Sequence, residues 1–474
     1  MKSPLPGLVL AFLGAAGSRA DVAFAPLFTD HAVLQQGKVV PVWGRADPQE
    51  HVSVTFRGQT VGATTGPDGR WVVLLGALPA SADGADLVAA GRKTRVVRSD
   101  VVVGEVWLCS GQSNMEFTVD DPRHPAFRLQ DAKAEVAAAQ FPLIRQFEVG
   151  RQVANAPTED ASGAWTPCAP GTVGAFSAVG YFFARDLHRR LNVPVGLIAS
   201  TWGGTPIEAW LSPWALGGDP AFAPVRGRWE RMPPDDPHKR SWEPAGLFNA
   251  MVNPVLPYAL RGVLWYQGET NAVRAGEYHA LFSTMITAWR AHFGQGDLPF
   301  YWVQLANYQD PHDPSGVSWA YLREAQAQAL DLPATGMAVT VDIGDAKNIH
   351  PRNKQEVGRR LALVAKAKAY GITGDYSGPV FLAAERSGAG MLVRFRYAEG
   401  GLTAAEKPLQ SFEIAGADRK FHPATAVIAG DTVLVQSPAV RDPVAVRYAW
   451  SDNPEANLYS GAGLPAVPFR SDNW

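Results

Sequence analysis

The sequence predicts an α/β core with a parallel sheet, flanked on both sides by β-sandwich-like units. Strand and helix patterns alternate between residues 105 and 380, which is typical of a parallel sheet covered by helices. Short strands separated by turns precede residue 104 and return after residue 380, which is typical of small β units. We therefore expect an N-terminal β domain over residues 21–104, an α/β domain over 105–380 and a C-terminal β unit over 381–474. The length of 474 residues agrees with two or three domains.

The first twenty residues have the pattern of a signal peptide. Lys2 precedes the apolar run LVLAFL at residues 8–13, and small residues follow up to Ala20. We therefore expect residues 1–20 to be removed and the protein to be secreted or periplasmic. No later apolar run is long enough to cross a bilayer. A net charge of −2 gives no reason to expect a nucleic acid or a membrane surface as a partner.

The sequence contains two cysteines, Cys109 and Cys168. A disulfide between them is compatible with export, but two cysteines do not make a disulfide scaffold. Because Cys109 lies in an apolar strand, we expect it to be a buried free thiol.

The predicted N-terminal domain consists of short strands joined by glycine-rich turns. It contains no catalytic combination of residues, so we interpret it as a scaffold or as an accessory that binds sugar. The expected strands are 39–44, 52–56, 71–75 and 94–97.

The central region alternates between buried strands and amphipathic helices. The expected strands begin at Glu105 and cover 195–200, 262–266, 300–305 and 337–341, and the expected helices cover 176–191, 278–293 and 354–370. Beyond it, the C-terminal unit has expected strands at 391–395, 432–435 and 444–448.

Four polar clusters follow strands of the central region: GQS at 111–113, GGT at 203–205, QGE at 267–269 and NIH at 348–350. Ligands of an open parallel sheet collect beyond the carboxyl ends of its strands. Ester hydrolysis by a serine needs a nucleophile, a nearby histidine and N–H donors for the oxyanion. Ser113 could merely cap a helix, but these clusters supply all three requirements at one edge of the sheet.

Four blocks of this sequence resemble the sialate O-acetylesterases, which belong to the SGNH (GDSL-like) hydrolase superfamily. The blocks are GQSNM (111–115), GGTPIEAW (203–210), WYQGETN (265–271) and IHPRNK (349–354). Similarity also extends into the flanks, at FTDHAVLQ (28–35) and YAWSDNP (448–454). The resemblance implies a flavodoxin-like SGNH core that works without a metal.

The resemblance also implies roles for individual residues. Ser113 matches the nucleophile and His350 the general base. The N–H groups of Ser113 and Gly204, with Gly203 as an alternative, and the amide of Gln267, with Asn271 in reserve, would bind the oxyanion. Glu269 is interpreted as a buried carboxylate that fixes its loop.

The sequence departs from the common SGNH pattern at one position. Many members place an aspartate three residues before the histidine, where this chain has Lys347. We expect Asp345 to orient His350, with Asp342 or a backbone carbonyl as the alternatives.

These observations predict a carbohydrate O-acetylesterase that acts through a Ser–His acyl-enzyme, with sialate O-acetylesterase as the favoured activity. An esterase of acetylated xylan or another polysaccharide is the first alternative, and a non-catalytic carbohydrate-binding protein is the second. No cofactor is expected. No metal is expected either, because the ten histidines show no ligand spacing and His312 lies in a polar, proline-rich loop.

Overall fold

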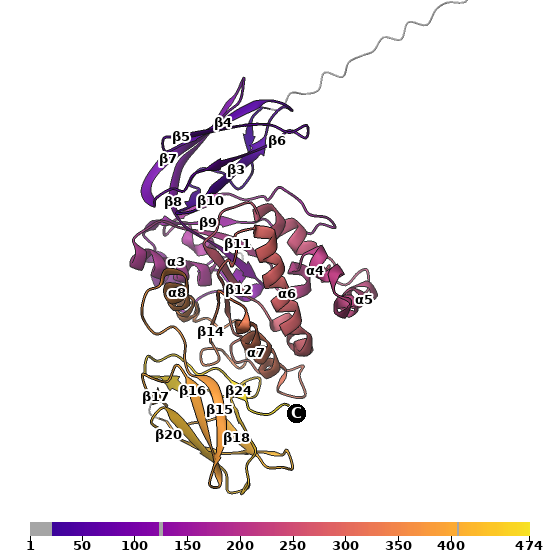
Figure 1. Ribbon diagram of the computed structural model, residues 1–474, viewed down its shortest axis with the longest axis vertical. Helices are drawn as coiled ribbons and strands as arrows, with labels where there is room; N and C mark the ends of the chain where they lie inside the picture. Colours follow the sequence, from indigo (N-terminus) through magenta and orange to yellow (C-terminus); the bar gives the residue numbers. More distant parts are fainter. Residues whose placement is uncertain (1–20, 123–126, 405–406) are drawn as a thin grey trace, which may run out of the picture.

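The computed structural model describes residues 21–122, 127–404 and 407–474. The predicted signal peptide, residues 1–20, lies outside this range. The described chain is a mixed α/β protein with several sheets, stacked in three tiers along its long axis. Figure 1 shows an N-terminal β unit at one end, the α/β core in the middle and a C-terminal β unit at the other end.

The central sheet has the strand order β10-β9-β11-β8-β12-β13-β14. All of its strands except the edge strand β10 are mutually parallel. Strand β10 runs antiparallel to β9. The bounds are Arg95–Gly111 for β8, Phe141–Glu148 for β9, Trp165–Cys168 for β10, Val195–Thr201 for β11, Gly262–Tyr266 for β12, Phe300–Val303 for β13 and Thr335–Ala338 for β14.

Large apolar side chains alternate between the two faces of this sheet, because successive residues of a strand point to opposite sides. On one face Trp107 contacts Phe183 of α3, and its indole N–H donates to the Tyr370 hydroxyl at the end of α8. On the other face Trp265 packs against Phe282 and Trp289 of α6. The helices are α3 (Ala178–Leu191), α6 (Ala275–Phe293), α7 (Ser318–Gln328) and α8 (Lys354–Tyr370).

The N-terminal unit and the core share the long strand β8. Its first part pairs with β7 and β2, and residues 105–111 pair with β11 and β12 of the central sheet. The boundary expected at residue 104 therefore falls inside one continuous strand. The unit contains β1 (Ala23–Phe24), β2 (Val33–Gln35), β3 (Val40–Arg45), β4 (His51–Phe56), β5 (Gln59–Thr64), β6 (Arg70–Leu75) and β7 (Ser81–Ala90).

The C-terminal unit has an apolar core of its own, separate from the one that the other two tiers share. It is fastened to α7 by Arg323, whose buried guanidinium donates to the carbonyls of Ser451 and Asp452. Its longer strands are β15 (Val380–Ser387), β16 (Gly390–Arg396), β18 (Phe412–Ala415), β20 (Thr425–Ala429), β21 (Thr432–Gln436) and β22 (Ala445–Tyr448).

Cys109 and Cys168 are both buried and free. Burial raises the pKa of each thiol to about 12, so both remain protonated at neutral pH. Among the described residues, no helix is long and apolar enough to span a membrane.

Candidate active site

The turn after β8 is possible only because residue 111 is glycine. Gly111 has φ +136, and a Cβ there would lie 2.1 Å from the carbonyl oxygen of Tyr266 on the neighbouring strand. The chain then reverses into the short helix α1 (Ser113–Glu116), and the N–H of Gln112 donates to the Tyr266 carbonyl. Ser113 therefore begins a helix at the carboxyl edge of the sheet, as the sequence predicts.

His350 lies beside this serine, on the segment between β14 and α8. Its Nε2 is 2.8 Å from Ser113 Oγ, and its ring packs against Phe127 with centroids 4.7 Å apart. Burial, and then the positive charge of Lys354, lower the pKa of His350 to about 4. The imidazole is therefore neutral at pH 7 and can accept the hydroxyl proton at Nε2.

Two adjacent glycines follow β11 and differ in what their N–H groups do. The N–H of Gly203 donates to Glu116 Oε2 at 2.5 Å. Gly204 has φ +71, and a Cβ added to it would meet no atom within 4 Å. Within the described chain neither the N–H of Gly204 nor that of Ser113 has a hydrogen-bond partner, so both remain available to a ligand.

These groups line one pocket of about 560 Å³. Its wall includes Ser113, His350, Gly204, Phe127, Trp202 and Arg151. Arg151 forms an ion pair with Glu116, and its side chain is 40% exposed. The pocket therefore combines a neutral Ser–His pair, two unused N–H donors and one accessible guanidinium.

Gln267 does not face this pocket, although the sequence predicted its amide as an oxyanion donor. It is fully buried, and its Nε2 donates to Asn271 Oδ1 at 2.8 Å and to Gln112 Oε1 at 3.1 Å. Its Oε1 accepts from the Tyr278 hydroxyl. The amide hydrogens of Gln267 are thus used inside the protein, and those of the reserve candidate Asn271 are directed to Glu208.

The predicted partners of His350 also point elsewhere. Asp345 is exposed, and its carboxylate accepts the backbone N–H of Lys347 at 2.8 Å. Asp342 forms a two-pronged ion pair with Arg360, at 2.6 and 2.8 Å. Among the residues that the structure describes, neither carboxylate lies within hydrogen-bonding distance of the His350 ring.

Asn114 connects the serine turn to the histidine segment, a link that sequence reasoning missed. Its Nδ2 donates to Glu269 Oε1 at 2.5 Å and to the Ile349 carbonyl at 3.0 Å. Its Oδ1 accepts from the buried ammonium of Lys354. Burial raises the pKa of Glu269 and lowers that of Lys354 to about 7. Glu269 therefore belongs to a network that joins three loops.

Of the residues that sequence analysis missed, Asn114, Glu116 and Lys354 lie in or next to the blocks named above, whereas Arg151 lies outside all of them. Asn114 directly follows Ser113, Glu116 comes directly after the GQSNM block, and Lys354 closes the histidine block. Their position beside the candidate nucleophile and base was the available signal. Within residues 21–122, 127–404 and 407–474, no three His, Cys, Asp or Glu side chains gather in a way that could hold a metal ion.

Comparisons with known proteins agree on a family. Residues 103–366 match the family model described as "Carbohydrate esterase, sialic acid-specific acetylesterase". The chain is 31% identical to the sialate O-acetylesterase of Rattus norvegicus, over 99% of both chains. It is 31% identical to the human enzyme, over 98% of this chain and 95% of that one.

A solved structure is also similar over the whole length. It is a carbohydrate acetylesterase from Xanthomonas citri, which is 41% identical to this chain and superposes with a TM-score of 0.87. The match covers 96% of this chain and all of the other.

Proposed function

Because this chain belongs to the sialic acid-specific acetylesterase family and is a carbohydrate O-acetylesterase, we propose that it removes acetyl groups from sialic acid through an acyl-enzyme on Ser113. The observation that carries this proposal is the 2.8 Å contact between Ser113 Oγ and His350 Nε2, in a pocket with two unused N–H donors.

In the first half of the proposed reaction, Ser113 Oγ attacks the acetyl carbonyl carbon while His350 Nε2 takes its proton. The N–H groups of Ser113 and Gly204 donate to the developing oxyanion. The bond between the carbonyl carbon and the sugar oxygen then breaks, and His350 returns the proton to that oxygen. The sugar leaves and the acetyl group remains on Ser113.

In the second half, water attacks the acetyl-serine and passes a proton to His350. The ester bond to Oγ breaks, Ser113 recovers its proton from His350, and acetate leaves. In this proposal Ser113 and His350 work as a dyad without Asp345. Gln267 has a structural role, because its buried amide donates to Gln112 and Asn271 and not to the oxyanion.

The choice of sialic acid is supported by Arg151. A sialic acid carries a carboxylate, which a guanidinium recognises well, whereas the xylose units of xylan have none. Arg151 is 40% exposed at the pocket that holds Ser113, although Glu116 neutralises part of its charge. We propose that Arg151 contacts the substrate carboxylate.

The core is proposed to be a flavodoxin-like SGNH domain over residues 105–380. The order β11-β8-β12-β13-β14 supports this, since, without the outer strands β9 and β10, it is the 2-1-3-4-5 order of flavodoxin-like sheets. The flanking β units would cover residues 21–104 and 381–474.

Residues 1–20 are proposed to be a signal peptide, which implies secretion or a periplasmic location.

The test compares acetate release from O-acetylated sialic acid, acetylated xylan and p-nitrophenyl acetate. We expect Arg151→Ala to raise KM for the sialic acid ester while the rate on p-nitrophenyl acetate stays the same. Mass spectrometry of a quenched reaction should find the acetyl group on Ser113. Faster release from xylan would favour the polysaccharide esterase, and no release from any ester would favour a carbohydrate-binding protein.

A further inference from the structure

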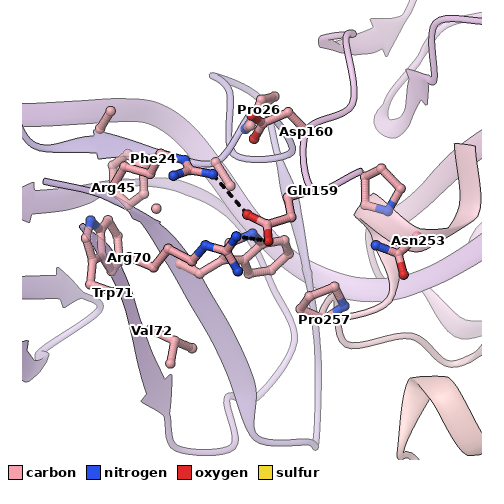
Figure 2. A pocket seen from close by; sticks show the side chains of 15 residues that line it. Phe24, Pro26, Arg45, Arg70, Trp71, Val72, Glu159, Asp160, Asn253 and Pro257 are labelled. Atoms are coloured by element: carbon pink, nitrogen blue, oxygen red, sulfur yellow. Dashed lines mark hydrogen bonds and ion pairs between the residues drawn. The ribbon is translucent and has the colours of Figure 1, made fainter. Parts of the chain in front are cut away.

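The protein has another cavity, which is larger than the pocket that holds Ser113. It is a cleft of about 660 Å³ between the N-terminal β unit and the core, shown in Figure 2. Its N-terminal wall comes from β1, β3 and β6, and its other wall comes from segments around Glu159 and Pro254. It shares no lining residue with the pocket of Ser113.

The floor of this cleft is apolar and rich in rings. Phe24 and Trp71 meet edge to face with centroids 5.8 Å apart and are almost fully buried, at 7% and 3% exposed, whereas Trp43 is half-buried. Pro254 and Pro257 line the cleft on the side of the core. At the mouth, Val72 remains 55% exposed, so apolar surface is open to solvent. Such surface beside a hollow is a common mark of a ligand site.

Charged groups bridge the two walls. Arg45 and Arg70 approach from the N-terminal unit, and both form ion pairs with Glu159 of the core. Figure 2 shows Glu159 between the two guanidinium groups. With Asp160, the lining carries two positive and two negative charges and is therefore neutral overall.

We propose that this cleft is a second, non-catalytic carbohydrate site that binds neutral sugar units. A pyranose has apolar C–H faces that fit the half-buried Trp43 and the exposed Pro257, and hydroxyl groups that fit guanidinium donors and carboxylate acceptors. An aliphatic chain would offer no hydrogen bonds to the charged groups at the mouth, which pair only with one another in its presence. An anionic sugar would meet Glu159 and Asp160 without a surplus of positive charge.

One loop connects this cleft with the site of the reaction. The loop between β9 and β10, residues 149–164, carries Arg151 at the pocket of Ser113 and Glu159 and Asp160 at the cleft. A sugar chain held in the cleft would therefore keep the enzyme on its substrate and contact a loop that lines the active site. The choice of a carbohydrate ligand rests on the proposed function, whereas the cleft itself does not.

The test uses two matched variants on one strand. Val72→Arg puts a charged side chain into the mouth of the cleft. Leu74→Arg, two residues along β6, changes an equally exposed side chain (57%) on the same face outside the cleft. Calorimetry with unacetylated xylohexaose, cellohexaose and sialyllactose measures binding without any ester. Total tryptophan fluorescence, to which Trp71 and Trp43 at the cleft contribute, follows the same titration.

We expect at least one neutral hexasaccharide to bind with Kd of about 1 mM or tighter. Val72→Arg should weaken this binding by at least about tenfold, Leu74→Arg should leave it unchanged, and both should hydrolyse p-nitrophenyl acetate at the normal rate. Absence of neutral sugar binding, binding that survives Val72→Arg, or stronger binding of sialyllactose at the cleft would overturn the proposal. Failure of the esterase proposal would appear separately, as loss of p-nitrophenyl acetate hydrolysis in the parent chain.

Discussion

Two polar clusters lie at the same edge of the central sheet, and they differ in how far their hydrogen-bonding capacity is used. The first contains Ser113, His350 and Gly204, and it faces the 560 Å³ pocket. The second contains Gln267, Asn271 and Glu208 and lies behind the pocket wall, where all three are buried.

In the second cluster the groups satisfy one another. Gln267 donates to Asn271, Asn271 donates to Glu208, and Tyr278 donates to Gln267. In the first cluster two backbone N–H groups have no partner in the described chain, and the Ser–His pair opens onto the pocket. Unused donors that face a cavity are what a reaction needs, whereas saturated donors hold a shape. The predictions below test this division.

The largest effect is expected from the nucleophile. Ser113→Ala should lower kcat by about 10⁴-fold or more, as loss of a catalytic serine generally does. The measurement is acetate release, with folding checked by thermal melting. A folded Ser113→Ala protein that kept a near-normal rate would remove the first cluster from the reaction.

The second effect is on the pH dependence of kcat/KM. Because the pKa of His350 is lowered to about 4, the neutral base persists as pH falls and is lost only below about pH 4. Below that value the rate should fall about tenfold for each pH unit. Lys354→Met removes the nearby charge and should move this acid limb upward by less than about one unit, since burial is the larger cause. An acid limb near pH 6.5 in the parent enzyme would contradict the desolvated histidine.

A smaller effect on kcat is expected when Gln267, in the second cluster, is replaced. Gln267→Leu removes one hydrogen bond each from Gln112, Asn271 and Tyr278, so it should destabilise the fold by about 1–3 kcal/mol and change kcat by about tenfold or less. Denaturant unfolding and kinetics on one ester measure both. A large loss of kcat at unchanged stability would instead make Gln267 an oxyanion donor.

The effect on kcat should be smaller still for Asp345 and Asp342, which precede His350 in the sequence. Asp345→Asn keeps an oxygen that can accept the Lys347 N–H, so we expect kcat to fall by about threefold or less. Asp342→Asn should weaken the ion pair with Arg360 and act on stability. A loss of about 10⁴ in either variant, at normal stability, would identify that aspartate as the third member of a triad.

No effect is expected from exhaustive chelation. The described residues offer no group of three metal ligands, so EDTA should leave the rate on p-nitrophenyl acetate unchanged. Inhibition that a divalent ion reversed would require a metal in the mechanism.

Much of the fold could be predicted from the sequence where apolar periodicity was strong. Strand β12 and helix α8 have the predicted bounds. Strand β9 was missed because Phe141–Glu148 includes Pro142 and two buried polar residues, Arg145 and Gln146, which break the apolar pattern. The buried polar side chains of β9 depend on tertiary contacts, such as that of Arg145 with the Asp100 carbonyl, in addition to one local hydrogen bond from Arg145 to the Pro142 carbonyl.

The candidate site also has residues that could be predicted from the sequence and residues that could not. Ser113 and His350 could be predicted because the strand–turn–helix pattern and the family blocks place them, and the structure brings their side chains together. The direction of the Gln267 amide could not, because it depends on Gln112, Asn271 and Tyr278, which come from three segments. For Asp345, the local turn with Lys347 competes for the carboxylate.

The shared strand β8 also limits how this protein can be rearranged by recombination. Residues Val101–Val103 and Val106–Cys109 are fully buried on both sides of residue 104. A genetic crossover there would have to preserve the apolar core that the first two tiers share, so we expect these two tiers to be exchangeable only as one piece. The third tier, with its separate apolar interior, follows the α8 helix that ends at Tyr370. That junction is where an exchanged module would disturb the least packing, provided that the incoming module offers carbonyls to Arg323.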